Sequence, residues 1–379
     1  MTKSIADHPP RLAVVDGWRA VAVMGVVWWH AWIHTGNPPL YVWSAHPVNL
    51  QRLLVLFGNG VHLFFVLSGF CICLALKKAT RPGGGSYLGF IANRWWRLTP
   101  AFYVVTVFTA VALIVHGEPV TWTQLAAHFT WLYSVWPGVN SLAAPFWSIP
   151  VEWEFYLIAP LLLVRPHRQK FVGLAVLMIA SLICRYHALT EVHVIPPIGD
   201  EHLITHFTSF AWGIMVAEGW INRSRWFQRI AGWLPMLAGF ALAYLGRAAV
   251  MQEVVQAFGP VAAFVKTAGH PIMTLGFAIM LAATLNGVRG AGEFLSQPVM
   301  QWLGRHSYSL YLWHWWPCVW VGHALRDQLG VTIVSHYLTL AATLAICLPL
   351  TWATYRFCEA PYFRQRHGQV AQPSVARSG

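Results

Sequence analysis

The chain has 379 residues, of which 57% are hydrophobic and only 10% are charged, and it contains 22 tryptophans. A soluble domain carries about 25% charged residues, so this composition excludes an ordinary soluble protein and predicts an all-α protein that crosses a membrane several times. The net charge of +12 does not indicate nucleic-acid binding, because the Lys and Arg residues of membrane proteins collect in cytoplasmic loops. The six cysteines have no metal-ligand spacing, so we expect neither a disulfide framework nor a zinc site.

Apolar segments of roughly 20 residues predict a bundle of about ten transmembrane helices. They lie near 12–34, 51–76, 98–116, 144–164, 170–188, 203–220, 230–248, 266–287, 300–324 and 332–358. Ten spans place both termini on one side, and most Lys and Arg residues then lie on that side, which we expect to be the cytoplasm. Segment 121–136 is too short to span, and its aromatic residues at helical spacing predict an interfacial helix on the outer surface. Residues 1–360 are expected to form one transmembrane domain, and 361–379 a disordered cytoplasmic tail.

The first apolar segment contains two ionisable residues, Arg19 and His30. Such residues are costly in a bilayer and usually line a pathway or a reaction site. Eleven residue steps come within about 20° of three whole turns and rise roughly 16 Å, so both side chains are expected on one face of the helix. The structural alternative is an arginine that extends to the headgroups and a histidine bonded to a backbone carbonyl.

Later predicted spans contain further ionisable residues. The positions of His30, Glu152 and His314 in their spans correspond to similar depths, so these groups are expected to converge in the outer half of the membrane. Glu152 could instead belong to a buried ion pair. His314 has tryptophans on both sides and could belong to an aromatic belt at the interface. His62 precedes an apolar run, and like His314 it could be a site residue or a residue of the aromatic belt.

Arg94 and Arg97 end the loop before the third predicted span, three residues apart and hence on one face if that end is helical. The planar guanidinium group suits bidentate binding of phosphate, so the pair could hold the phosphates of a soluble cofactor. Alternatively, the two arginines only orient the protein in the membrane.

Six motifs occur in order along the chain: RLAVVDGWRA at 11–20 with His30, GVHLFFVLSGF at 60–70, RxxRxxP at 94–100, WSxxxExxFY at 147–156, SYSLYLWH at 307–314 and YRxxExP at 355–361. Together they resemble the acyltransferase-3 family of integral membrane acyltransferases, over nearly the whole chain. The family commonly has an acidic residue where His62 stands and glycine where Ala20 stands. The difference at His62 suggests a specialised acceptor.

The resemblance implies ten helices, an acyl-CoA donor, most simply acetyl-CoA, and transfer to a hydroxyl group of a glycan, a glycolipid or a small secondary metabolite. It also implies a multi-pass protein of the cell membrane whose acceptor is on the extracytoplasmic side. Finally, it implies functional roles for Arg19, His30, Glu152 and the pair formed by Arg94 and Arg97.

We therefore expect Arg94 and Arg97 to hold the phosphates of acyl-CoA while the pantetheine arm passes Arg19. Burial keeps an imidazole neutral, so His30 could act as general base on the acceptor hydroxyl. Glu152 would set the tautomer of His30 if it lies within hydrogen-bond reach, and would otherwise position the acceptor.

Several alternatives stay open at this point. An acyl intermediate could form on His30 or on Ser68. No permanently bound cofactor and no metal are expected. The competing class is a transporter without chemistry, which would also use ionisable residues inside the membrane. The other candidate site residues are His62, Trp147, Tyr311 and His314.

Overall fold

The computed structural model describes residues 12–40, 50–79, 86–136, 138–190, 202–251 and 261–362, and within these ranges the chain is helical without any β-strand. The longer helices are α1 (Ala13–His34), α3 (Gly60–Ala79), α4 (Tyr87–Val115), α6 (Ser148–Leu163), α7 (His167–Thr190), α8 (Leu203–Ile221), α10 (Trp233–Ala248), α12 (Ala262–Leu285), α16 (Trp315–Leu329) and α17 (Ile333–Thr354). The shorter ones are α2 (Leu50–Gly58), α5 (Trp122–Phe129), η1 (Ala144–Trp147), α9 (Arg225–Gln228), α13 (Ala291–Leu295), α14 (Pro298–Arg305), α15 (Ser307–Trp313) and the π-helical turn η3 (Tyr355–Glu359).

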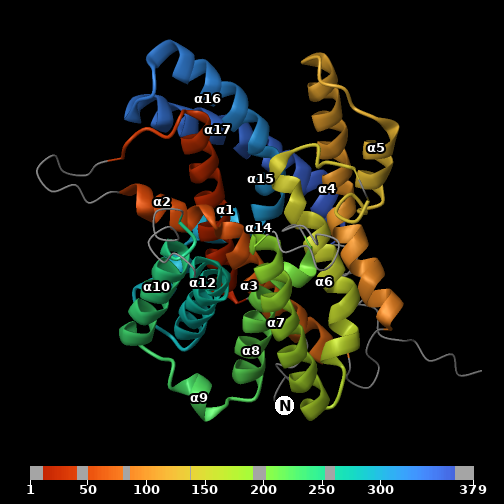
Figure 1. Ribbon diagram of the computed structural model, residues 1–379, viewed down its shortest axis with the longest axis vertical. Coiled ribbons are helices and arrows are strands. Elements are labelled where there is room, and N and C mark those ends of the chain that lie inside the picture. Colours follow the sequence, from red (N-terminus) through yellow and green to blue (C-terminus); the bar gives the residue numbers. More distant parts are fainter. Residues whose placement is uncertain are drawn as a thin grey trace, which may run out of the picture.

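Helix α1 runs through the middle of the molecule and packs against α2, α3, α14 and α16 (Figure 1). Small residues let helix backbones approach closely, which is a usual basis of helix association in membranes. A Cβ atom on Gly60 of α3 would lie only 2.1 Å from the backbone oxygen of Ala22 in α1. On another side, Trp18 Nε1 donates a hydrogen bond to Thr284 Oγ1 of α12 (3.0 Å). These contacts fix the position of α1 against α3 and α12, and therefore also the positions of the polar residues that α1 carries.

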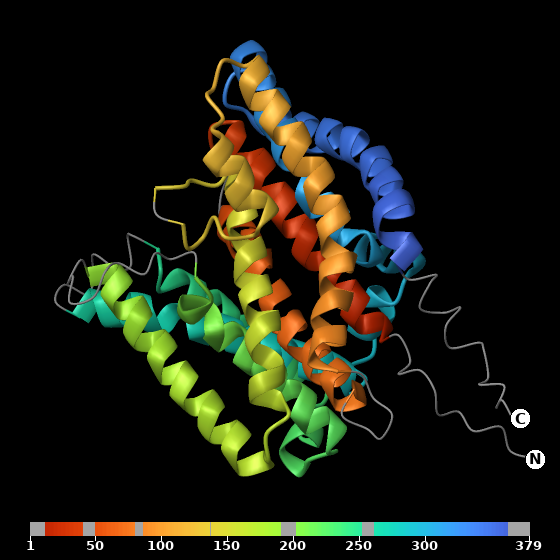
Figure 2. The ribbon, with the colours of Figure 1, turned by 90° about the vertical axis from the view of Figure 1, so that its right-hand side faces the viewer.

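Other helices pack in the same way, and α4 and α6 run side by side (Figure 2). Helix α8 packs against α3, α7 and α12. Helices α10 and α12 approach at two glycine pairs, because a Cβ on Gly246 would lie 2.5 Å from Gly269 O and a Cβ on Gly276 2.4 Å from Gly239 O. A larger residue at any of these positions would force the two helices apart.

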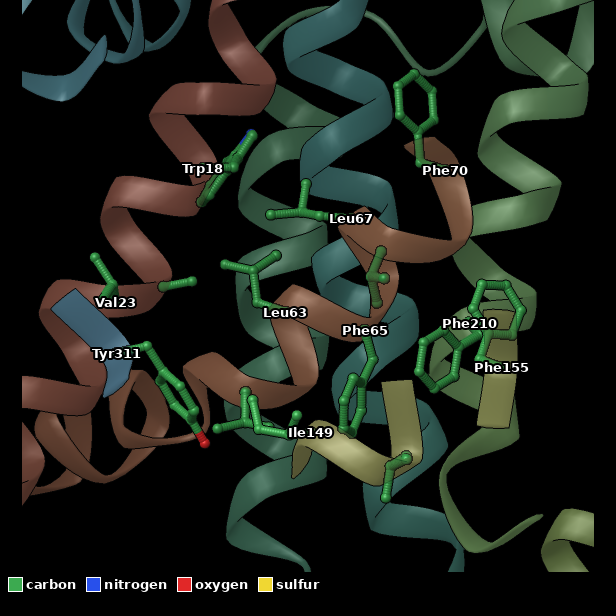
Figure 3. Close-up of a cluster of buried hydrophobic side chains, with 14 of the residues drawn as sticks. Trp18, Val23, Leu63, Phe65, Leu67, Phe70, Ile149, Phe155, Phe210 and Tyr311 are labelled. Carbon is green, nitrogen blue, oxygen red and sulfur yellow. The ribbon is translucent and has the colours of Figure 1, made fainter. Parts of the chain in front are cut away.

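Aromatic rings fill the space between α3, α6 and α8 (Figure 3). The ring of Phe210 in α8 stacks on Phe155 of α6, with 4.2 Å between ring centres, and on Phe65 of α3, with 4.7 Å. Tyr311 of α15 lies near Ile149 at the edge of this cluster and lines a cavity with it (Figure 3). The core therefore borders directly on the polar groups of the candidate site.

Six of the described helices are long and apolar enough to cross a membrane: Gly60–Lys78, Tyr87–Val115, Ala144–Leu163, His167–Leu189, Ala262–Leu285 and Ile333–Tyr362. The protein is therefore a multi-pass membrane protein, but the predicted count of ten spans is not confirmed. Helix α1 has 22 residues and closely matches the predicted range 12–34, yet its polar residues lower its hydropathy. Helix α10 has only 16 residues. The predicted tail lies outside the described residues from residue 363 on.

Two predicted spans are interrupted, and polar side chains at the interruptions bond to the backbone. The span predicted at 51–76 breaks at Asn59, whose Nδ2 donates to Val55 O (2.7 Å). The span predicted at 300–324 breaks at His306 and His314, whose Nδ1 atoms lie 2.7 and 2.6 Å from the backbone oxygens of Trp302 and Tyr311. Side chains that bond to nearby backbone groups compete with continuous helix. A hydropathy pattern does not register this competition.

Within segment 121–136 only Trp122–Phe129 are helical; they form α5, which begins with a capping box made by Thr121 and Gln124. With eight residues it is too short to span, as predicted. In the last turn of the helix, His128 ties this segment to the chain that leads into η1. Its Nδ1 lies 2.7 Å from the backbone oxygen of Gln124, and its Nε2 accepts a hydrogen bond from Leu142 N (3.1 Å).

Acidification is expected to loosen this connection. Burial lowers the pKa of His128 to about 4, whereas an unfolded histidine has a pKa of about 6.5. The stability that the neutral ring contributes is therefore complete above about pH 6.5 and is lost as the pH falls towards about 4. Protonation also removes the acceptor for Leu142 N.

Hydrogen exchange of the Leu142 amide, corrected for intrinsic exchange, should accelerate from pH 7 to about pH 5. Equal protection at both values would contradict this expectation, and His128→Leu should abolish the pH dependence.

Candidate active site

Two cavities lie along α1. The first, here called the arginine cavity, has a volume of about 80 Å³ and is lined among others by Arg19, Arg97, Glu152, Tyr156 and Glu359. The second, here called the histidine cavity, has a volume of about 600 Å³ and is lined among others by Trp29, His30, Asn59, His62, Asn140 and Trp147. Val61 and Tyr311 line both cavities. The cavities therefore adjoin, and α1 places Arg19 in one and His30 in the other, on the shared face that the sequence predicts.

His30 lies against His314, which comes from the break between α15 and α16. The Nδ1 atom of His30 lies 3.0 Å from Nε2 of His314. The Nδ1 atom of His314 lies 2.6 Å from the backbone oxygen of Tyr311. The predicted convergence therefore holds for this pair, although the two residues are far apart in the sequence.

These contacts determine which nitrogens carry protons when both rings are neutral. A carbonyl oxygen only accepts, so His314 Nδ1 must donate to Tyr311. The Nε2 atom of His314 is then an acceptor, and His30 Nδ1 must donate to it. The remaining nitrogen, His30 Nε2, therefore has a lone pair. A residue with this tautomer at a cavity wall can accept a proton from a bound hydroxyl group.

The predicted convergence does not hold for Glu152. Its carboxylate accepts hydrogen bonds from Ser68 Oγ (3.0 Å) and from the hydroxyl of Tyr156, and it lines the arginine cavity. Depth along a helix does not determine which neighbour a side chain faces, and α6 turns Glu152 towards α3 and not towards His30. The residue that contacts His30 is His314, so of the two roles predicted for Glu152 the arrangement does not support the one that requires a direct contact with His30.

Ser68 and Trp147 have different positions relative to the cavities. Ser68 is buried, lines neither cavity and donates its hydroxyl proton to Glu152. This position offers no support for an acyl intermediate on Ser68. Trp147 lines the histidine cavity, with its ring centre 6.3 Å from that of His62.

Tyr311 stands where the two cavities meet. Its hydroxyl donates to Pro145 O (2.6 Å), and the hydroxyls of Tyr311 and Ser148 are 2.8 Å apart. A phenol has one proton, so Ser148 must be the donor in the second contact. The Tyr311 side chain thereby ties α15 to η1, while its backbone oxygen holds His314. Tyr311 is thereby linked to His30 through His314.

Arg19 is held by residues of α1 and α3. Its Nη1 atom lies 3.7 Å from Asp16 Oδ1, and its Nη2 atom lies 3.9 Å from Cys71 Sγ. An acidic partner reduces the cost of keeping a cation out of water. The arginine lines the arginine cavity, so its position fits contact with a bound molecule.

Arg94 and Arg97 lie within helix α4 and not at the end of a loop, because the helix begins already at Tyr87, capped by Ser86. Arg97 lines the arginine cavity. The Arg94 guanidinium instead lies over the rings of Phe90 and Tyr156, at 5.3 and 5.7 Å from their centres. The two arginines therefore do not form a symmetrical clamp.

Sequence reasoning assigned no role to Tyr156 or Glu359, although both occur in the motifs. Glu359 is 2% exposed, accepts a hydrogen bond from Ser309 Oγ (2.5 Å) and lines the arginine cavity. The carboxyl groups of Glu152 and Glu359 thus line the same cavity as Arg19 and Arg97. Their positions in the motifs at 147–156 and 355–361 are the sequence signal that could have identified these two residues.

Comparison with known proteins gives a consistent result. The sequence profile of the acyltransferase-3 family, described as an acyltransferase domain, matches residues 12–352. OatA, an O-acetyltransferase of Staphylococcus aureus strain NCTC 8325, is 26% identical over 380 residues, which cover 93% of this chain and 57% of OatA. YrhL of Bacillus subtilis strain 168, named as a putative peptidoglycan O-acetyltransferase, is 23% identical over 383 residues, covering 94% of this chain and 55% of YrhL.

The chain thus spans a little over half the length of the curated relatives it matches. No solved structure matches it significantly. The family profile covers most of the chain, so the protein belongs to the acyltransferase-3 family.

Proposed function

We propose that this acyltransferase-3 family member is an O-acetyltransferase that moves an acetyl group from cytoplasmic acetyl-CoA to a hydroxyl group of a glycan or glycolipid outside the cytoplasm. The observation that supports this most strongly is the chain of hydrogen bonds from Tyr311 O through His314 to His30. It leaves a basic nitrogen at the larger of two adjoining cavities.

The proposed reaction starts with the thioester end of acetyl-CoA in the arginine cavity and the acceptor in the histidine cavity. The thioester lies near Tyr311 and Val61, where the cavities adjoin. His30 Nε2 takes the proton of the acceptor hydroxyl as its oxygen attacks the thioester carbonyl. The C–S bond then breaks, and the imidazolium returns its proton to the leaving thiolate. The products are the O-acetyl ester and CoA with a free thiol, and His314 stabilises the transient charge on His30.

The histidine cavity has the chemistry that a carbohydrate acceptor requires. Small-molecule sites combine apolar walls with a few polar groups that fix orientation. Here Trp29 and Trp147 supply apolar surface, while Asn59, Asn140 and Ser141 supply amide and hydroxyl groups. The relative YrhL, named for peptidoglycan, supports a cell-wall glycan as the acceptor class.

A thiol-release assay tests the proposal. Purified protein in detergent, given acetyl-CoA without acceptor, should slowly release free CoA thiol, and muropeptides or other glycan fragments should accelerate the release. Mass spectrometry should then find one acetyl group on the fragment. A transporter, the competing class that the comparisons do not favour, would release no thiol under either condition.

The proposed topology has both termini in the cytoplasm. Single cysteines at the exposed positions Lys78 and Arg168 should then be labelled only from the cytoplasmic side by an impermeant maleimide. His128 is buried, so the exposed Trp122 is the suitable position for the outer surface. Labelling of Trp122→Cys from the inside would overturn this orientation.

The two arginines of α4 should contribute unequally to donor binding. Arg97→Gln removes a cation from the arginine cavity and should raise the apparent KM for acetyl-CoA ~10-fold to ~100-fold, as loss of a charge-assisted hydrogen bond would. Arg94→Gln, whose guanidinium lies over two rings, should raise it less. Arg168→Gln, an exposed arginine of α7, is the matched control. Equal KM values for all three variants, at normal protein abundance, would support the alternative that these arginines only orient the protein.

A further inference from the structure

Three histidines from three helices gather beside the histidine cavity: His62 of α3, His206 of α8 and His270 of α12. One ligand atom from each ring lies within 4.8 Å of the other two. The ring centres are 4.4 Å apart for His62 and His270, 5.3 Å for His62 and His206, and 5.4 Å for His206 and His270. Three imidazoles bound to one tetrahedral Zn²⁺ at about 2.1 Å have ring centres about 5 Å apart. The cluster therefore has the dimensions of a three-histidine metal site.

The environment of His270 indicates that this ring needs a further partner. Its side chain is 2% exposed, and neither Nδ1 nor Nε2 has a hydrogen-bond partner. A neutral imidazole has one donor and one acceptor, and leaving both unsatisfied in a buried place is costly. Other buried histidines of the protein do have partners, as His128 and His314 show. A metal ion would engage one of the two nitrogens of His270 through a coordinate bond.

The three helices form a rigid support for such a site. Helix α8 packs so closely on α3 that a Cβ on Gly213 would lie 1.9 Å from Val66 O, and a Cβ on Gly69 would lie 2.1 Å from Phe210 O. Helix α12 packs against both α3 and α8. The ring of Trp147 covers the cluster, with its centre 5.0 Å from that of His206. Ligands on packed helices keep a more precise geometry than ligands on loops.

We propose that His62, His206 and His270 bind one divalent transition-metal ion, with Zn²⁺ as the best match to three imidazole ligands. This departs from the expectation of no metal, which rested on local ligand spacing and could not register three histidines far apart in the sequence. His62 also lines the histidine cavity, so the metal stands at the wall of the cavity that holds His30. A zinc ion with three protein ligands supplies a fourth position for water or a hydroxyl group.

The charges around the cluster affect this fourth position. Arg185 of α7 and Arg247 of α10 interact electrostatically with His62. Positive charges nearby oppose a bare cation and favour an anionic fourth ligand such as hydroxide. The same positive charges would also favour an anion bound directly among neutral histidines. The experiment must therefore distinguish a metal ion from an anion without a metal.

Metal analysis of the purified full-length protein tests the proposal independently of acetyl transfer. The affinity tag is removed, the protein is treated with a chelator and dialysed, and Zn²⁺ alone is titrated back. We expect one tightly bound Zn²⁺ per chain and a raised unfolding temperature. X-ray absorption should show about three nitrogen ligands at about 2.0–2.1 Å. Absence of stoichiometric binding, with stabilisation by phosphate or sulfate instead, would overturn the metal site in favour of an anion site.

Variants locate the ion. His206→Ala and His270→Gln should each weaken Zn²⁺ binding tenfold or more and abolish the stabilisation by Zn²⁺. His336→Gln is the matched control, because His336 is also buried but bonds to Trp28 in another part of the bundle; it should bind Zn²⁺ like the unmodified protein. Unchanged Zn²⁺ affinity in both cluster variants would overturn the assignment. If a variant does not fold, the number and distance of nitrogen ligands seen by X-ray absorption in the unmodified protein still test the proposed zinc site.

Discussion

Replacing His30 by Gln is expected to leave a folded, membrane-inserted protein whose acetyl transfer is ~10²-fold to ~10⁴-fold slower, as is typical for loss of a general base. Gln is polar and of similar length, so its amide can donate to His314 Nε2 as His30 Nδ1 does. It has no basic nitrogen to place in the histidine cavity. The loss should therefore appear in kcat, with little change in the KM for acetyl-CoA, and is measured by thiol release and by acetyl groups on the acceptor.

His34→Gln is the matched control for this substitution, since His34 lies one turn further along α1 and does not line the histidine cavity. It should retain most of the activity. Protein amount and acetyl-CoA binding must be equal in both variants before rates are compared. Full activity of His30→Gln under these conditions would falsify the proposed role of His30 as base.

The sequence predicted positions along helices better than it predicted partners. The helix expected at 12–34 is observed at Ala13–His34, and Arg19 and His30 lie in adjoining cavities as their common face requires. Hydrophobic periodicity and length decide such features locally. Whether Glu152 reaches His30 was left open by the sequence, and the residue found beside His30 is His314, because partners depend on how helices rotate and pack against one another.

The breaks within predicted spans could not be predicted from hydropathy. At the break, the His314 ring bonds to the backbone of Tyr311, and Pro317 follows three residues later. A proline removes a backbone donor from the helix and favours such an interruption. The break places the His314 ring against His30.

The histidine cluster shows a different limitation. His206 and His270 lie within the predicted spans 203–220 and 266–287, so the criterion that singled out His30 applied to them as well. Each one alone is indistinguishable from a histidine that bonds to a backbone group. Only the packing of α3, α8 and α12 brings them together with His62.

Replacing His314 by Leu is expected to slow acetyl transfer ~10²-fold or more while His30 is still present, because a wrong tautomer disables a catalytic histidine even when its position is kept. Leu cannot accept the proton of His30 Nδ1, so that proton can move to Nε2 and block the base. The effect should fall on kcat and leave the KM for acetyl-CoA nearly unchanged, since His314 lines neither cavity.

His314→Gln distinguishes this role from simple packing. Its amide oxygen can accept from His30 while its amide nitrogen donates to Tyr311 O, so it should recover most of the activity that His314→Leu loses. A merely structural His314 would give the opposite order, because burying a Gln with imperfect hydrogen bonds costs more than burying a Leu at a site with 0% exposure. Thermal unfolding temperatures and kcat values of both variants separate the tautomer role from a packing role. If His314→Gln is less stable than His314→Leu but has the higher kcat, His314 acts through the proton on His30.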